Sequence, residues 1–264
     1  MPVFSNKGVA IALLWTASTL SFAEACDEHL IAVAPITSDV VLCKGQFLLG
    51  YDVDQRIPDW VAYKLTKESV EKYHQRSDYF VADERVPQGG SAALSDYAGS
   101  GFDRGHLAPS ASIDVSKEAM EQSFQLSNIA PQLPSLNRRG WKVMEAEVRD
   151  LAIEHGTVYV VSGTQGNYRQ VGAALSDTKA NKSGRIKVGG LPNLGLMLDG
   201  HVSIPAYFYK AIYVPSMNAS GVYIIPHQGM DGRETKTYFF PLEKARRLLQ
   251  LSLFESTDSS FIGY

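Results

Sequence analysis

The chain has 264 residues, of which 45% are hydrophobic and 10% aromatic, and this is enough apolar material for one sizeable core rather than a disordered or repetitive chain. Its 25 basic and 28 acidic side chains give a formal net charge of −3, so a polyanion would have to be bound by a local cluster of positive charge. The two cysteines are too few for a four-cysteine zinc site or a disulfide-dense scaffold, but they allow one disulfide.

The first 25 residues have the pattern of an export signal. Lys7 is followed by an uncharged stretch, 8–23, that ends in small residues. A membrane anchor is the alternative, but this stretch has 16 residues, whereas a bilayer span needs roughly 20. We therefore expect a signal peptide at 1–25 and a mature domain at 26–264, exported to the periplasm or the extracellular medium and free of the membrane after cleavage.

Export changes the expected state of Cys26 and Cys43, because thiols tend to pair in an oxidising compartment. A bridge would close a loop of about 18 residues and, in the chain-entropy model, stabilise the fold by roughly 3 kcal/mol. The alternatives are two unrelated thiols or a lipid attached to Cys26, and the polar Glu24 disfavours lipidation.

The chain alternates between segments with sheet and helix patterns. Short runs of aromatic and β-branched residues predict strands, a polar, glycine-rich stretch predicts a surface loop, and apolar positions spaced by three and four predict helices. In chain order we expect strands at 47–51 and 60–66, a surface loop at 83–101, a helix at 135–156, a strand at 158–161, a basic loop at 176–190, strands at 207–214 and 222–225, and a helix at 242–253. A single mixed α+β domain accounts for this order.

The densest polar cluster follows the glycine-rich loop. Asp103, Arg104 and His106 bring a carboxylate, a guanidinium and an imidazole together within four residues. An imidazole, with an unperturbed pKa of about 6.5, is suited to activating water near neutral pH. The structural alternative is a surface ion pair between Asp103 and Arg104 beside an ordinary, partly buried histidine.

A second polar group lies on the helix expected at 135–156. Asn137 stands at its start, and Glu145 and Arg149 follow on one flank, beside an apolar face that includes Trp141. This flank could face a cleft. Taken alone, Glu145 and Arg149 would instead be interpreted as a solvent-facing pair at i,i+4, worth a few tenths of a kcal/mol.

Together these residues resemble the DNA/RNA non-specific endonucleases of the ββα-metal group, which includes secreted bacterial nucleases and mitochondrial endonuclease G. The hallmark Asp-Arg-Gly-His is present at 103–106, and the downstream Asn-x-x-x-Trp is present at 137–141. The resemblance extends from about residue 48 to the C-terminus. It implies an α+β domain with a central, largely antiparallel sheet, flanking helices and a ββα-metal motif at the active site.

The resemblance also implies a role for each residue. His106 matches the general base that takes a proton from the attacking water, and Asn137 matches the direct ligand of one Mg²⁺ ion, for which Mn²⁺ is the alternative. Glu145 matches a residue that orients metal-bound water, and Asp103 matches a group that braces the motif behind the metal ligand. Four arginines are expected to grip or stabilise the phosphate: Arg104, Arg149, Arg76 and Arg138. Among them, Arg76 is the best candidate for an upstream family arginine, and Arg138 is equally well explained by surface display.

The implied function is a metal-dependent endonuclease that cleaves DNA and RNA, single- or double-stranded, and leaves 5′-phosphate ends. Low sequence specificity is expected because phosphates carry no direct base information. The alternatives are an inactive nucleic-acid-binding or uptake protein of the same fold and a phosphodiesterase for small substrates, whereas the chain lacks the Gly-x-Ser-x-Gly motif of a serine hydrolase. The sequence contains no signal for or against a homodimer or a protein inhibitor.

Overall fold

The computed structural model describes residues 26–30, 35–166, 197–198, 202–255, 257 and 259–262. The predicted signal peptide at 1–25 and the predicted basic loop at 176–190 lie outside the described residues. None of the helices in the described part is long and apolar enough to cross a bilayer.

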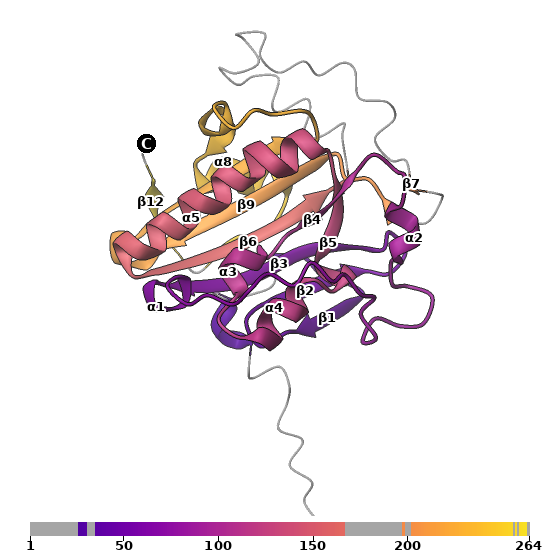
Figure 1. The fold of residues 1–264 in the computed structure, drawn as a ribbon. Coiled ribbons are helices and arrows are strands. Elements are labelled where there is room, and N and C mark those ends of the chain that lie inside the picture. The colour runs from indigo at the N-terminus through magenta and orange to yellow at the C-terminus, as the bar shows by residue number, and fades with distance from the viewer. Residues whose placement is uncertain are drawn as a thin grey trace, which may run out of the picture.

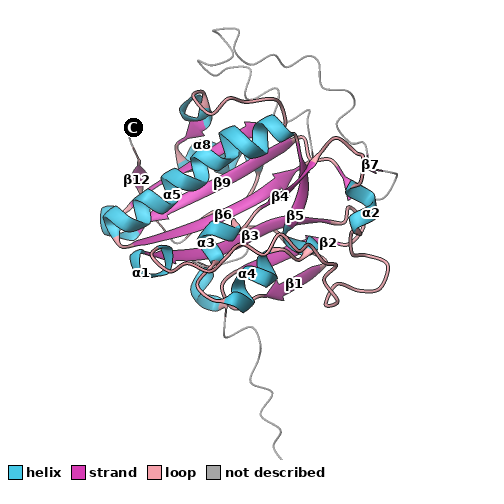
Figure 2. Cartoon of the chain, in the orientation of Figure 1, coloured by secondary structure: helices cyan, strands magenta, loops and turns pink. Residues whose placement is uncertain are grey.

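The core of the fold is a single eight-stranded sheet (Figures 1 and 2). Its strands are β1 (Val40–Cys43), β2 (Leu48–Asp52), β3 (Ile57–Thr66), β6 (Thr157–Gln165), β9 (Tyr207–Val214), β10 (Ala219–Pro226), β11 (Phe239–Phe240) and β12 (Ser260–Phe261). The order is β1-β2-β3-β6-β9-β10-β11, with β12 beside β10, and only the β10–β12 pairing in this sheet is parallel. The predicted α+β class with a largely antiparallel sheet is confirmed.

The predicted strands occur where expected, with some ends shifted. β9 has the predicted bounds, β3 begins at Ile57 rather than at position 60, and β10 extends the predicted 222–225 in both directions. Every residue of β10, and every residue of β9 except Tyr213, is buried. Strands covered on both faces need no polar side, so they appear in the sequence as continuous apolar runs rather than as alternating patterns.

One long helix lies across a face of the sheet, and shorter helices lie beside it on the same side (Figure 1). The long helix is α5 (Lys142–His155), preceded by a π-helical turn, η3 (Leu136–Trp141). The helix predicted at 135–156 is therefore confirmed, with a wider first turn than expected. The other helices are α1 (Lys67–Val70), α2 (Leu94–Tyr97), α3 (Ser110–Ile113), α4 (Lys117–Ser123) and α8 (Leu242–Leu249), and the 3₁₀ turns are η1 (Asp27–His29), η2 (Leu126–Asn128), η4 (Pro215–Met217) and η5 (Thr235–Tyr238).

The C-terminal helix is shorter than the predicted 242–253. α8 ends at Leu249 because Gln250 takes a left-handed conformation with φ of 56°, and the Gln250 N–H closes the last turn on the Arg246 carbonyl. Leu251 and Leu253 are nevertheless buried. They continue the apolar pattern after the helix has ended, which explains the longer prediction.

The prediction of a surface loop at 83–101 is wrong in part. The segment contains α2, and Asp83 and Tyr97 are only 1% and 4% exposed. The Asp96 carboxylate accepts the Ala93 backbone N–H at 2.7 Å and so fixes the start of α2. Some of the polar residues that suggested solvent exposure are thus anchors inside the protein.

Two short pairs of strands complete the fold. β4 (Asp103–His106) pairs antiparallel with β5 (Ile129–Gln132), and β7 (Met197–Leu198) pairs with β8 (Val202–Ser203). Near the start of the described chain, Cys26 and Cys43 form a disulfide, in agreement with the expectation from sequence. The bridge joins the residue before η1 to the last residue of β1.

Candidate active site

The two sequence motifs meet in space through a strand pair and a helix. β4 carries Asp103, Arg104 and His106, and its register on β5 places His106 opposite Ile129. The indole Nε1 of Trp141, at the end of η3, donates a hydrogen bond to the His106 carbonyl oxygen at 3.2 Å. The antiparallel pair and the following helix therefore form the expected ββα arrangement.

His106 is enclosed by aromatic rings. Its ring centroid lies 5.5 Å from that of Phe80 and 4.8 Å from that of Phe124. Burial, together with the positive charges of Arg76 and Arg104, lowers the pKa of His106 to about 3. The imidazole is therefore neutral at neutral pH, and its buried Nε2 has no hydrogen-bond partner among the described residues. A neutral ring with an unpaired nitrogen is able to accept a proton.

Asn137 and Asp103 are linked directly. The Asn137 amide nitrogen donates to Asp103 Oδ2 at 2.9 Å, and Arg138 donates to both Asp103 oxygens at 2.7 and 2.6 Å. Burial tends to raise the pKa of Asp103, but these hydrogen bonds outweigh burial and hold it below its usual value. The ionised Asp103 thus orients the Asn137 amide. The Arg138 side chain is 69% exposed, and while it is paired with Asp103 it also lines the cleft.

Glu145 and Arg149 project from α5 into the interior rather than into solvent. Both are half-buried, and no ion pair joins them within the described ranges, so the expected solvent-facing pair is not formed. Burial raises the pKa of Glu145, while the charges of Lys210 and Arg149 oppose that rise. The buried Arg149 Nη1 has no hydrogen-bond partner in the described part of the chain and is available to an anion.

Sequence reasoning missed Lys210, which lies beneath this helix. Lys210 is fully buried on β9, and its Nζ donates to Ser162 Oγ at 2.6 Å and to Tyr63 OH at 3.2 Å. Nζ also lies 4.5 Å from the centroid of the Trp141 ring. The available signal was a single lysine inside the otherwise apolar run at 207–214.

Two upstream arginines lie on aromatic rings. The Arg104 guanidinium is 4.4 Å from the Phe80 centroid, and the Arg76 guanidinium is 4.9 Å from the Phe124 centroid. Arg76 Nη1 also donates to Ser110 Oγ at 2.6 Å. Arg76 is also paired with the Asp78 carboxylate at 2.5 Å, whereas no ion pair of Arg104 is found among the described residues. The ring contacts orient both guanidinium groups, and orientation of this kind suits bidentate binding of phosphate oxygens.

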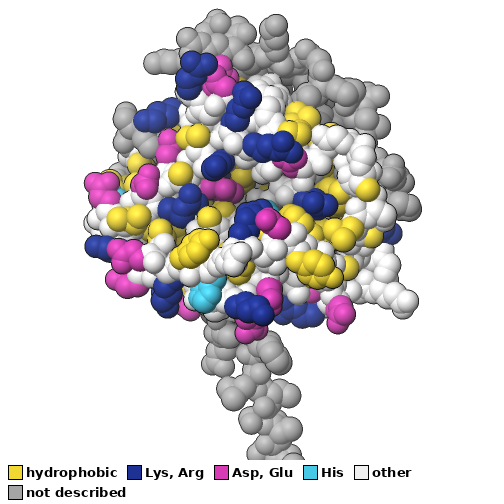
Figure 3. All heavy atoms as spheres, viewed as in Figure 1, with side chains coloured by type: hydrophobic (Ala, Val, Ile, Leu, Met, Phe, Trp, Pro, Cys, Tyr) yellow, Lys and Arg dark blue, Asp and Glu magenta, His cyan; other side chains and the backbone are white. Residues whose placement is uncertain are grey.

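One cleft of about 320 Å³ collects these side chains. All the site residues predicted from sequence line it, except Asp103, which lies behind Asn137, and the disulfide cysteines. The structure adds Ser110 and Lys142 to the lining. Figure 3 shows several Lys and Arg side chains across the middle of the face that carries α5, with Asp and Glu side chains among them. The cleft itself is lined by four arginines and Lys142 but by a single carboxylate, that of Glu145, so it is locally positive despite the net negative charge.

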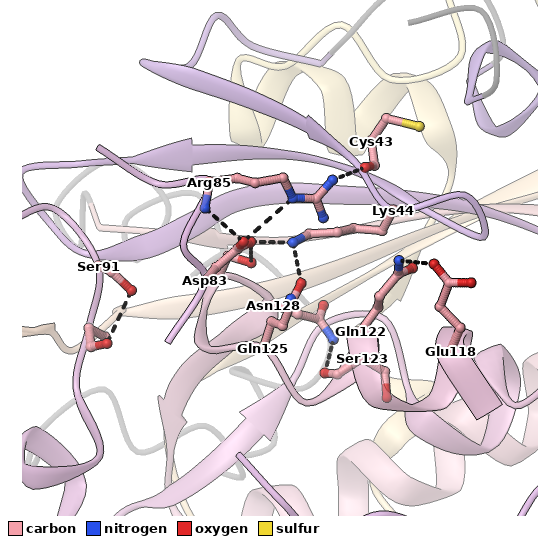
Figure 4. Close-up of polar contacts among 12 residues, drawn as sticks. Cys43, Lys44, Asp83, Arg85, Ser91, Glu118, Gln122, Ser123, Gln125 and Asn128 are labelled. Carbon is pink, nitrogen blue, oxygen red and sulfur yellow. Dashed lines mark hydrogen bonds and ion pairs between the residues drawn. The ribbon is translucent and has the colours of Figure 1, made fainter. Parts of the chain in front are cut away.

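A buried polar cluster supports the segment after His106 (Figure 4). Lys44 donates to Asp83 and Gln125, and Ser127 Oγ donates to Asp83 at 2.6 Å. The neighbouring Asn128 side chain closes two hydrogen bonds of 2.9 Å on the backbone of Ala108. Neither Asn128 nor the Lys44–Asp83 pair was predicted, because the contact of Asn128 with Ala108 spans 20 positions and that of Lys44 with Asp83 spans 39.

The donor atoms in the cleft suit a hard cation that retains most of its water. Within the described ranges, no three His, Cys, Asp or Glu side chains are placed to hold one metal ion. Because the Asn137 amide nitrogen is bonded to Asp103, the amide oxygen is the atom left free for a ligand. Mg²⁺ binds oxygen and commonly keeps several waters. The residues therefore fit a Mg²⁺ ion held by Asn137 and water better than a metal ion enclosed by protein ligands alone.

Comparison with known proteins gives the same picture over almost the whole chain. The family model described as DNA/RNA non-specific endonuclease matches residues 27–260. Nuclease C1 of Cunninghamella echinulata var. echinulata is 31% identical over 245 residues, which cover 87% of this chain and 88% of that protein. Mitochondrial endonuclease G of Bos taurus is 31% identical over 209 residues, covering 77% and 65%. In a crystal structure of the EndoG/EndoGI complex, a chain that is 26% identical superposes with a TM-score of 0.74, covering 91% of this chain and 94% of that one.

Proposed function

The chain belongs to the DNA/RNA non-specific endonuclease family, and on this premise we propose that it is an exported, Mg²⁺-dependent endonuclease that hydrolyses phosphodiester bonds in DNA and RNA. The observation that carries the proposal is the convergence of His106, Asn137 and Glu145 on one arginine-lined cleft. A neutral base, an oriented amide oxygen and oriented guanidinium groups are what hydrolysis of a phosphodiester by water requires.

His106 acts as the general base in this proposal. Its unpaired Nε2 accepts a proton from the attacking water, and the rings of Phe80 and Phe124 fix its direction. The charges of Arg76 and Arg104 contribute to the low pKa of the free protein. A bound phosphate would offset these charges and so raise the basicity of the imidazole when substrate is present.

The other residues hold the phosphate and the water. Asp103 fixes Asn137, whose amide oxygen would hold the metal ion. A bound ion would neutralise charge that develops on the phosphate and the leaving oxygen. Arg104, Arg76 and Arg149 contact phosphate oxygens, and Glu145 accepts a hydrogen bond from the attacking water. Attack by water breaks the bond from phosphorus to the 3′ oxygen, which leaves a 5′-phosphate and a 3′-hydroxyl end.

The same arrangement supports a broad substrate range. The proposed contacts are to phosphates, which do not report base identity, and the nucleophile is an external water rather than a ribose 2′-hydroxyl. DNA and RNA should therefore both be substrates, as the family description states for its members.

Export and regulation by a protein inhibitor are further parts of the proposal. Export rests on the leader pattern at 1–25 and on the Cys26–Cys43 bridge, which suits an oxidising compartment. Inhibitor binding rests on the likeness to the chain in the EndoG/EndoGI complex. Fractionation of cells that express the full chain, with intact-mass analysis of the recovered protein, tests the first: mature protein outside the cytoplasm is expected, and full-length protein inside it would contradict export.

The decisive experiment measures cleavage of supercoiled DNA and of an unrelated RNA by purified residues 26–264. We expect degradation of both with Mg²⁺ or Mn²⁺, no degradation with chelator, and loss of activity in Asn137→Ala. Binding without cleavage would instead identify an inactive uptake or scaffold protein. Cleavage of a small phosphodiester but of neither polymer would identify a small-substrate phosphodiesterase.

A further inference from the structure

A second hollow lies next to the active-site cleft. It has a volume of about 350 Å³ and lies between the segment 74–77 and one side of α4. Arg76 lines both the cleft and this hollow. Any extended polymer that places one phosphate in the cleft can therefore continue past Arg76 into a space of small-ligand size.

Arg76 is held firmly at the junction of the two spaces. Its guanidinium contacts the Asp78 carboxylate, donates to Ser110 Oγ and lies over the Phe124 ring. The three partners come from its own segment, from α3 and from the residue after α4. A guanidinium fixed from three sides is already oriented for an anion, so little side-chain entropy is lost on binding.

The walls of the hollow combine flat, apolar and cationic groups. His74 is exposed, and Met120, a buried residue with 3% exposure, lies in the wall beside it. Lys117, at the first position of α4, is 85% exposed, and its Nζ lies 3.6 Å from the Glu121 carboxylate. A planar ring beside an apolar surface is suited to a nucleobase. The exposed ammonium of Lys117 is suited to a phosphate, which would compete for it with the Glu121 carboxylate that also lines the hollow.

The backbone at His74 is anchored as well. The buried Asp114 carboxyl accepts a hydrogen bond from the His74 backbone, and this bond opposes the rise in the pKa of Asp114 that burial causes. Asp114 follows directly after α3, the helix that also carries Ser110. The same short helix thus positions both His74 and Arg76, so the hollow and the cleft keep a fixed separation.

We propose that this hollow is a nucleotide subsite that receives the nucleotide next to the scissile phosphate, with its base against His74 and Met120 and its outer phosphate near Lys117. The inference rests on the proposed function, because it takes the cleft as the place of the scissile phosphate. The subsite recognises a base by its flat face and not by its edge, so it adds affinity without sequence preference.

Binding of a fluorescein-labelled single-stranded octanucleotide, measured by anisotropy in the presence of chelator, tests the subsite without requiring cleavage. His74→Ala should weaken binding about fivefold, the lower end of the range for loss of one stacking contact. Tyr79→Ala is the matched control, since Tyr79 is 74% exposed in the same stretch but does not line the hollow. Equal effects of the two substitutions, or no effect of His74→Ala, would overturn the proposal.

A plot of log affinity against log salt should be less steep for Lys117→Ala than for the wild type. The magnitude of the slope should fall by about 0.7, the value for one phosphate contact on a single strand. Lys72→Ala is its control, because Lys72 is an exposed lysine outside the hollow. An unchanged slope for Lys117→Ala, or an equal change for Lys72→Ala, would contradict the phosphate contact.

Steady-state kinetics then separate this inference from the proposed function. In His74→Ala the rise in KM should be larger for the octanucleotide than for bis(p-nitrophenyl) phosphate, which reaches only the cleft. Equal rises for both substrates would place His74 in the cleft and overturn the subsite. A wild-type protein that cleaves neither substrate would contradict the proposed function, and the anisotropy result would still decide the subsite.

Discussion

Two groups of buried polar side chains lie close together in this molecule: the cluster around Lys44 and Asp83, and the lining of the cleft. They differ in whether their buried donors and acceptors have hydrogen-bond partners. In the cluster around Lys44 and Asp83, every buried side-chain donor and acceptor has a partner. In the cleft, by contrast, His106 Nε2 and Arg149 Nη1 are buried without one among the described residues. Unpaired buried polar atoms cost free energy. The two unpaired atoms of the cleft belong to residues that line a space a phosphate can enter, so we assign the paired cluster to stability and the unpaired one to chemistry.

The largest expected effect comes from breaking the paired cluster. Lys44→Met would leave the 1% exposed Asp83 carboxylate with only the 45% exposed Arg85, 3.6 Å away, as a counter-charge, and loss of one partner from a buried pair costs up to about 3–5 kcal/mol. Urea unfolding measures the change in free energy. The matched control is Lys64→Met: Lys64 pairs with Glu28 at the surface, so its loss should cost less than about 1 kcal/mol. Equal losses would mean that Lys44 and Asp83 are not a buried pair in solution.

Reduction of the disulfide next to this cluster is expected to cost somewhat less. Cys43 precedes Lys44, and its carbonyl accepts a hydrogen bond of 2.6 Å from Arg85, so the bridge holds the chain where the paired cluster begins. Chain entropy gives roughly 3 kcal/mol for a loop of this length. Urea unfolding with and without reductant measures the loss, and intact mass should rise by two hydrogens on reduction. An unchanged mass would show that the two thiols are not bridged.

A substitution in the cleft should instead affect activity more than stability. His106→Ala should lower the rate of hydrolysis at least about a hundredfold, as expected for a general base, while circular dichroism still shows a folded protein. Removal of the ring leaves a cavity between Phe80 and Phe124 and lowers the thermal midpoint, but it breaks no hydrogen bond of His106 Nε2 within the described structure. Turnover near the wild-type rate would exclude His106 as the base.

The same contrast explains how far the sequence could predict the molecule. Local patterns located β2, β3, β6, β9, β10, the long helix and the motif at 103–106, because periodicity and short spacings are written in neighbouring residues. They did not predict the short strands, among them β4, which carries the motif, and β5, which pairs with it. They also identified Asn137, Glu145 and Arg149 as one group, since helix geometry relates positions along one element. Which of these side chains would be left unpaired depends on distant segments.

What the sequence could not predict is pairing between those distant segments. Lys44 and Asp83 are 39 positions apart, and nothing local distinguishes them from surface charges. Lys210 lies in an apolar strand, and its partners Ser162 and Tyr63 come from two other strands.

The smallest expected effect concerns the arginines of the cleft, and it tests whether they are available to an anion as their geometry indicates. Affinity for nucleic acid in chelator should fall with salt, and Arg76→Gln should lower the slope of log affinity against log salt by about 0.7 to 0.9 for the loss of one phosphate contact. Arg247→Gln on α8 removes an equally exposed charge that does not line the cleft and should leave the slope unchanged. A flat salt response of the wild type would contradict phosphate-directed binding, and equal slopes for the two variants would mean that Arg76 serves only to pair with Asp78 and Ser110. Arg76 already has these two partners. If Arg76→Gln nevertheless reduces the slope by the full amount expected for one phosphate contact, a guanidinium can be held in place by protein contacts and still bind phosphate.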